Sequence, residues 1–303
     1  MPIILDKENL KKLGKRKPKR VKPLKSPVKP EREVKQRIQA MYKYSLEPSI
    51  QKVKDALNSN MSLEELGLLL DQLLRKAEQD YNMRGGSILD VWRMSMGEET
   101  RYKLHAALSK SLGVDLTAVL DTPEIKDALA LGSMEFERLV KTMPTKVLGE
   151  VADAVSKNMR GIPLPENRSL LKQIDFIGTK SKKWAKVIAR DQTAKMTSLL
   201  NQTRQTMLGV SVYIWRTSKD ERVVGNPGGI YPTGNKVHGN HYIMEGKYCQ
   251  WDDATVYSVD KGKTWKQRTG EMPKEHPGMQ IQCRCYAEPV IDVQQILEYA
   301  QAA

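Results

Sequence analysis

The sequence predicts an α+β fold, and three observations lead to this class. Residues 1–30 are basic and rich in proline, which predicts a disordered arm. Residues 31–208 carry apolar side chains at helical spacing and predict a mainly α-helical region. Residues 209–303 alternate short β-branched runs with glycine-rich turns, which predicts a small mixed α+β domain with short antiparallel strands.

The arm holds most of the positive charge of this 303-residue chain. Eleven Lys or Arg and two acidic residues give it a net charge of +9, out of +14 for the whole chain. We expect that the arm can be deleted without unfolding the rest, and that it contacts DNA phosphates or an acidic protein surface. A solvated tail is the alternative. The expected DNA contacts are Lys11, Lys12, Lys15, Arg16, Lys17, Lys19, Arg20, Lys22 and Lys25.

Local signals mark where helices begin and end in the second region. Ser62 and Glu65 form a capping box ahead of a leucine-rich stripe. A long helix is expected from about residue 168 to residue 208, with Gly209 as its C-terminal cap.

Another helix start lies in the middle of the chain. Thr122 is followed by Pro123, a capping hydroxyl and then a proline at the first helical position. We expect Ala128, Leu131 and Met134 to lie on the buried face of this helix.

The C-terminal region predicts three strand-forming stretches and a final helix. Residues 210–215 read as a strand, residues 256–265 as a hairpin, and residues 280–287 as a last strand. A brief helix is expected over 293–303. We expect the strand that carries the paired cysteines to lie against the one that carries Trp215.

The sequence indicates a protein that is made in a cytoplasm and contacts no membrane. No run approaches the roughly 18 apolar residues of a membrane span, and the first residues lack the apolar core of a signal peptide. We therefore expect Cys249, Cys283 and Cys285 to be thiols or metal ligands and not disulfides.

Two cysteines and two histidines suggest a zinc site. Cys283 and Cys285 share one face of a strand, a geometry that disfavours a disulfide between them. His238 and His241 are three residues apart and meet on one side of a helical turn. Two histidines and two cysteines suit tetrahedral zinc, although the C-x-C spacing is tighter than usual.

Other interpretations of these residues stay open. Cys249 and His276 are spare candidates for the metal. The cysteines can instead be small buried apolar residues beside a core histidine. A catalytic site would use His238 or His241 as base with Arg222 or Arg284 as anion clamp. Asp252 and Asp253 are weak candidates for a divalent ion, and the nucleotide-binding and hydrolase motifs are missing.

Several short runs, in order and spacing, resemble the phage head morphogenesis family typified by the F protein of phage Mu. The runs are 188–195, 209–217, 220–223, 241–246, 251–253, 276–278 and 283–285. The family's pattern falls on Trp215, Arg216, Asp220, Arg222, His241, Gly246, Pro277, Gly278, Cys283, Arg284 and Cys285. A glycine-rich insert between Val224 and His238 departs from the pattern.

The resemblance implies a minor capsid protein of a virion, present in few copies. Such a protein acts in head morphogenesis and capsid assembly, and in DNA packaging or ejection. The implied partners are the portal protein, the major capsid or scaffold protein, and packaged double-stranded DNA. The implied place is the capsid interior near the portal vertex. No enzymatic activity is implied. The alternatives are a nuclease-like enzyme that uses His238 or His241 with Arg222, and a host nucleic-acid-binding protein.

Overall fold

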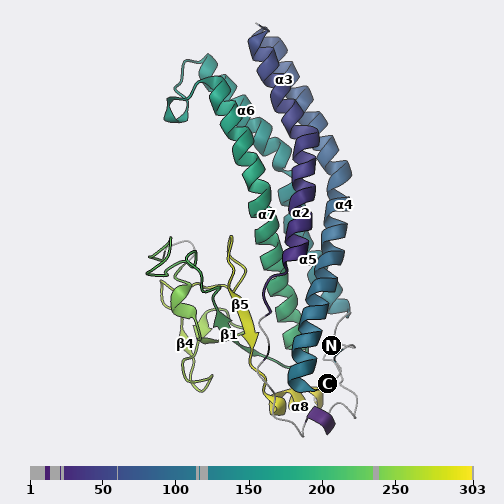
Figure 1. Ribbon diagram of the computed structural model, residues 1–303, viewed down its shortest axis with the longest axis vertical. Helices are drawn as coiled ribbons and strands as arrows, with labels where there is room; N and C mark the ends of the chain where they lie inside the picture. The colour runs from purple at the N-terminus through teal and green to yellow at the C-terminus, as the bar shows by residue number, and fades with distance from the viewer. Residues whose placement is uncertain are drawn as a thin grey trace. The chain divides into compact units, whose positions relative to one another are not determined.

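The computed structural model confirms the α+β class. It describes residues 11–13, 21, 24–59, 61–113, 116, 122–234 and 239–301. Long helices precede a small antiparallel sheet (Figure 1). The chain forms two compact units: the sheet-bearing unit takes in 1–28, 95–132 and 191–303, and the helical unit takes in 29–94 and 133–190. Residue 209, where the predicted helical region gives way to predicted strands, therefore marks a change of secondary structure and not the edge of a compact unit.

Up to residue 207, the described part of the chain is mainly helical, and its named elements are all helices or short helical turns. They are α2 (Val28–Met41), η1 (Tyr42–Leu46), α3 (Glu47–Asn58), α4 (Leu63–Leu112), α5 (Pro123–Lys141), α6 (Met143–Met159), η3 (Pro165–Asn167) and α7 (Leu170–Met207).

The helical unit is held together by an apolar core with polar links between helices. Trp92 of α4 packs edge-on against Phe136 of α5, with ring centroids 4.6 Å apart. The Tyr42 hydroxyl donates to the carbonyl of Gly178 in α7 at 3.1 Å. This bond satisfies a buried hydroxyl, and so allows a tyrosine in an otherwise apolar core.

Two expected helix starts are confirmed. The backbone N–H of Ser62 donates to Glu65 at 3.0 Å, and the N–H of Glu65 donates to the Ser62 hydroxyl at 3.2 Å, which is the reciprocal capping box ahead of α4. Helix α5 begins at Pro123.

The expected buried face of α5 was wrong in part. Ala128 is buried, but Leu131 and Met134 are 63% and 66% exposed. The buried side instead carries Ile125, Ala128, Phe136 and Val140, which lie within about 120° of one another around a helix of 3.6 residues per turn. Leu131 and Met134 lie on the opposite side of the helix from Phe136.

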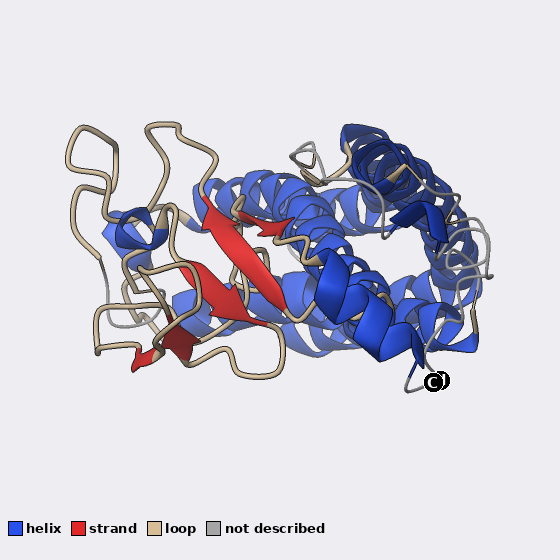
Figure 2. Ribbon diagram, turned by 90° about the horizontal axis from the view of Figure 1, so that it is seen from below, coloured by secondary structure: helices blue, strands red, loops and turns tan. Residues whose placement is uncertain are grey.

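The sheet-bearing unit adds five short strands, a short helical turn and a last helix. They are β1 (Val212–Arg216), η4 (Tyr242–Met244), β2 (Tyr248–Gln250), β3 (Val256–Tyr257), β4 (Lys266–Gln267), β5 (Tyr286–Pro289) and α8 (Val293–Gln301). One sheet has the order β2-β1-β5 with antiparallel pairs, and β3 and β4 form the expected hairpin. The three strands lie side by side among loops in Figure 2.

The strand after the paired cysteines lies against the strand that carries Trp215, as expected. Trp215 is opposite Ala287 in the β1–β5 pair. Strand β5 begins only at Tyr286, so both cysteines precede it and the predicted strand was too long. The cause is Gln282, whose φ of +56° breaks the extended backbone.

The described part of the arm corrects the expectation that the arm is separable. Leu13, Val21 and Leu24 are buried in one apolar cluster with residues of α4 and with Ile296 of α8. Deleting 1–30 would therefore uncover a core. Lys11, Lys12 and Lys25 are exposed. The other expected DNA contacts, Lys15, Arg16, Lys17, Lys19, Arg20 and Lys22, lie outside the described residues.

Candidate metal centre

His241, Cys283 and Cys285 come together in the sheet-bearing unit, and we call them the Cys–His cluster. The Nδ1 atom of His241 lies 3.4 Å from the Sγ atom of each cysteine. The three potential ligand atoms all lie within 4.8 Å of one another. All three side chains are buried. Within the described part of the chain, no other group of three such residues is arranged to hold a metal ion.

The backbone around the cluster places its members. His241 directly precedes η4, while Cys283 and Cys285 lead into β5. Arg284, between the cysteines, is exposed, so the alternation expected of an extended segment is kept even ahead of the strand. Gly278 has a φ of +90°, and its N–H donates to the Cys283 sulfur at 3.4 Å. The Pro277-Gly278 turn therefore donates a hydrogen bond directly to a member of the cluster.

The second ring nitrogen of His241 also has a partner. Its Nε2 atom lies within hydrogen-bonding distance of the Gln280 side-chain oxygen. The imidazole stands edge-on to the ring of Trp215, with centroids 5.6 Å apart. Gln280 and Trp215 therefore fix the ring so that Nδ1 points at the two sulfurs.

The two thiols of the cluster differ in acidity because they share a hydrogen bond. The hydrogen bond from Cys285 lowers the pKa of Cys283 well below its usual range, and His241 adds to this effect. The same hydrogen bond raises the pKa of Cys285, and burial raises it further.

Ion pairs surround the cluster without entering it. Arg216 donates to Glu288 at 2.5 Å and to Glu245 at 3.3 Å. Glu245 also accepts from the Thr217 backbone N–H at 2.6 Å. Arg284 and Asp220 pair at 2.7 Å at the surface. These contacts neutralise Arg216, Asp220 and Arg284 of the resembling pattern.

The remaining candidates lie elsewhere or outside the described residues. His238, the expected fourth ligand, lies outside them. Cys249 is buried opposite Tyr213 across β1 and β2 and is not a member of the cluster. The Nδ1 atom of His276 lies 3.0 Å from the Tyr213 hydroxyl and forms a hydrogen bond with it. Asp253 accepts from the Thr255 backbone N–H at 2.8 Å and so stabilises a turn. Arg222 is exposed.

Sequence reasoning missed two polar residues that matter here. Gln280 had no signal in the sequence, because an isolated glutamine does not reveal which ring nitrogen it will meet. Arg268 is 6% exposed and donates to the carbonyl oxygens of Val256, Pro273 and Glu275. It supports the loop that precedes His276.

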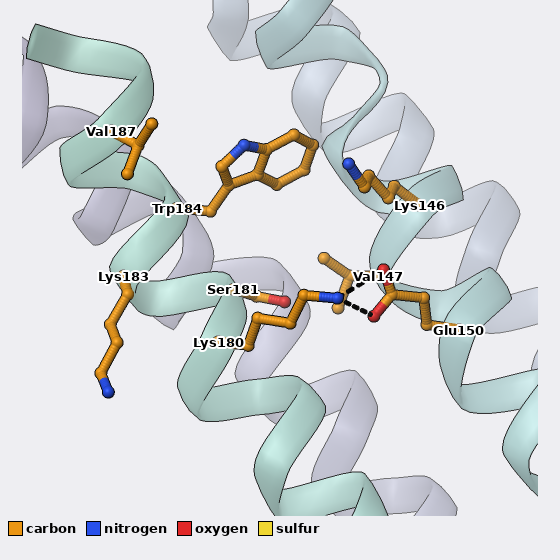
Figure 3. A pocket seen from close by; sticks show the side chains of 8 residues that line it. All are labelled: Lys146, Val147, Glu150, Lys180, Ser181, Lys183, Trp184 and Val187. Atoms are coloured by element: carbon orange, nitrogen blue, oxygen red, sulfur yellow. Dashed lines mark hydrogen bonds and ion pairs between the residues drawn. The ribbon is translucent and has the colours of Figure 1, made fainter. Parts of the chain in front are cut away.

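The helical unit contains a pocket of about 270 Å³ between α6 and α7 (Figure 3). Trp184 and Val147 supply apolar walls, and the Lys146 ammonium lies 3.8 Å from the centroid of the Trp184 ring. Lys180 and Glu150 form an ion pair at 3.1 Å. Since these two groups neutralise each other, the pocket is a weaker candidate for chemistry than the Cys–His cluster.

Comparison with known proteins finds a similarity over part of the chain. A protein of Haemophilus influenzae strain Rd, described as an uncharacterized protein, is 29% identical over 196 residues, which cover 62% of this chain and 36% of that protein. The chain thus spans little more than a third of that relative. No family model matches the chain. No solved structure matches it either. Among the described helices, none has both the length and the apolar character that a membrane span requires.

Proposed function

We propose that the chain is a phage minor head protein that acts in head morphogenesis. One observation carries the proposal: the residues on which the resemblance rests come from separate segments and converge on one folded centre. Trp215 packs against His241, and His241 meets Cys283 and Cys285. A chance match of short runs gives no reason for such convergence.

The pattern's other residues have structural roles in the same unit. Gly246 has a φ of +79°, and its N–H donates to the carbonyl of Trp215 at 2.9 Å. Arg216 bridges two glutamates, and Asp220 pairs with Arg284. The pattern therefore builds part of a folded core, which favours a protein that acts by assembly over one that acts by catalysis.

The proposed partners are the portal protein, the major capsid or scaffold protein, and packaged DNA. Exposed apolar side chains on the helices suit contacts with head proteins; they include Leu68, Met83, Met94, Tyr102, Leu131 and Met134. The net charge of the arm suits DNA phosphates. The proposed place is the capsid interior near the portal vertex, reached from the host cytoplasm during assembly.

The geometry of His241 does not favour the nuclease alternative, whose other candidate base, His238, lies outside the described residues. A general base must reach its substrate, but His241 is only 4% exposed and both of its ring nitrogens face protein groups. Arg222 is exposed, and its backbone N–H donates a hydrogen bond to the Asp220 side chain. A host nucleic-acid-binding protein would account for the arm but leaves the folded C-terminal pattern without a role.

Quantitative mass spectrometry of purified particles tests the proposal. We expect the protein in virions and in procapsids, at a few copies for each complete shell of the major capsid protein. Tails separated from heads serve as the control and should lack it. Absence from both heads and procapsids would contradict the proposal, and a purified protein that cleaves DNA would favour the enzyme instead.

A further inference from the structure

We infer that the Cys–His cluster binds one Zn²⁺ ion through His241 Nδ1, Cys283 Sγ and Cys285 Sγ. A tetrahedral zinc with Zn–S of about 2.3 Å and Zn–N of about 2.0 Å sets its nitrogen and sulfur ligands about 3.5 Å apart. The two observed separations from Nδ1 to sulfur are both 3.4 Å. An ion could therefore be accepted with little movement of these side chains.

The partners of the two His241 ring nitrogens are compatible with metal binding at Nδ1. A ligating histidine needs a free lone pair on one ring nitrogen, and it usually donates the other N–H to an oxygen acceptor. Gln280 offers such an oxygen to Nε2. With the proton on Nε2, the lone pair of Nδ1 is directed at the space between Cys283 and Cys285.

Two N–H groups are placed to stabilise thiolate sulfurs. The Gly278 N–H already donates to Cys283. The indole N–H of Trp215 is buried without a hydrogen-bond partner, in the same apolar cluster as Cys283 and Cys285. A buried N–H without an acceptor is costly, and a metal-bound thiolate at Cys285 would provide one.

Charge balance favours a divalent ion in this buried place. Two thiolates and Zn²⁺ sum to zero, whereas two thiolates alone would be an uncompensated buried charge. Arg216 cannot supply the compensation because Glu245 and Glu288 already neutralise it. Imidazole and thiolate are ligands that zinc accepts readily.

The ion would link three separate parts of the unit. His241 precedes η4, Cys283 accepts from the 276–278 turn, and Cys285 leads into β5. We infer an ion that fixes the end of the sheet, since all three of its ligands are buried. The inference goes beyond the proposed function and does not depend on it.

Elemental analysis of the purified full-length chain is the first test. We expect one zinc per chain in the wild type, and a loss of at least half of it in Cys283→Ser and Cys285→Ser. Cys249→Ser is the matched control, because Cys249 is also buried in the same apolar cluster but is not a ligand. It should retain its zinc. Zinc-free wild type with reduced cysteines and an intact fold would overturn the inference.

A second variant separates metal binding from folding. Gln280→Ala removes the partner of Nε2 but no ligand, so the protein should fold and its zinc affinity should fall about 10- to 100-fold. Competition with a chromogenic chelator measures the affinity, and cobalt substitution should give the charge-transfer band of thiolate ligands. An affinity equal to that of the wild type would refute the assignment of Nδ1 as a ligand. Incorporation of the protein into particles is measured separately. The zinc site and the proposed head function can therefore fail independently of each other.

Discussion

Arg216 is the residue on which the charge balance of the sheet edge depends. Its side chain bridges Glu245 and Glu288, and the Glu288 side chain is only 6% exposed. Without the guanidinium, the buried Glu288 carboxylate would lose its ion pair with Arg216. Such a loss is far more costly than the loss of an ion pair in water, because the remaining charge stays desolvated.

We expect Arg216→Gln to lower the free energy of unfolding by about 2–3 kcal/mol. Arg284→Gln breaks the surface pair with Asp220, whose side chain is 34% exposed, and should cost only about 0–1 kcal/mol. Chemical denaturation followed by tryptophan fluorescence compares the two variants. Equal costs would show that Glu288 is not the buried partner that its position suggests.

His276 predicts a pH dependence of stability. Its pKa is lowered to about 4, first by burial and then by the charge of Arg268, although Asp252 and Asp253 act in the opposite direction. The unfolded chain takes up a proton near pH 6.5 and the folded chain only near pH 4. Folding is therefore penalised as the pH falls between these values, by up to about 1.4 kcal/mol per pH unit.

Denaturation at pH 7 and pH 5 tests this linkage. We expect His276→Gln to lose less stability than the wild type between the two values, because the variant has no proton to take up at this position. Above pH 7 the two proteins should show parallel pH dependence. A wild type and variant that lose the same amount between pH 7 and pH 5 would contradict the role of His276.

At the scale of elements, two glycines end helices in the same way but in different surroundings. Gly209 has a φ of +75° after α7, and Gly161 has a φ of +68° after α6. In both turns the next residue's N–H bonds to a carbonyl five residues back, as in the Schellman motif. A Cβ on Gly209 would lie 2.8 Å from the Cβ of Tyr299 in α8, whereas Gly161 faces open space.

Alanine substitutions at Gly161 and Gly209 distinguish the cost of backbone strain from the cost of steric crowding. Gly161→Ala should cost about 1 kcal/mol, from the left-handed backbone alone. Gly209→Ala should cost about 1–3 kcal/mol more, because α8 must move to accommodate the methyl group. Thermal unfolding of both variants gives the difference. If the two costs were equal, the contact between the 209 turn and α8 would be absent.

Local signals were predictable from sequence, and tertiary ones were not. The capping box at Ser62 and Glu65 and the cap at Gly209 depend on neighbouring residues, and both are confirmed. The early stop of the last strand depends on the backbone of Gln282. The buried side of α5 depends on its packing partners, so a pattern that fitted Leu131 was misleading.

The candidate site shows the same division. The meeting of His241 with Cys283 and Cys285 was predicted because the residue types restrict the chemistry. The acceptor role of Gln280 was not predicted, because it depends on the folded positions of two segments that are distant in the sequence.

For the whole molecule, the uneven distribution of charge has a measurable consequence for DNA binding. If the nine basic residues assigned to the arm neutralise nine phosphates, the logarithm of the binding constant should fall with the logarithm of salt concentration at a slope of about −8. A chain whose charge was spread over its folded units would show a shallower slope.

The matched experiment must keep the apolar part of the arm, because Leu13, Val21 and Leu24 belong to a core of the sheet-bearing unit. Replacing the nine basic residues with glutamine leaves that core in place and should flatten the slope by about eight units, as measured by fluorescence anisotropy on duplex DNA over a salt series. Leu13→Ala should lower stability by about 2–5 kcal/mol without changing the slope. A slope that survives neutralisation would place the DNA contacts on the folded units, and the arm would then serve only to complete their core.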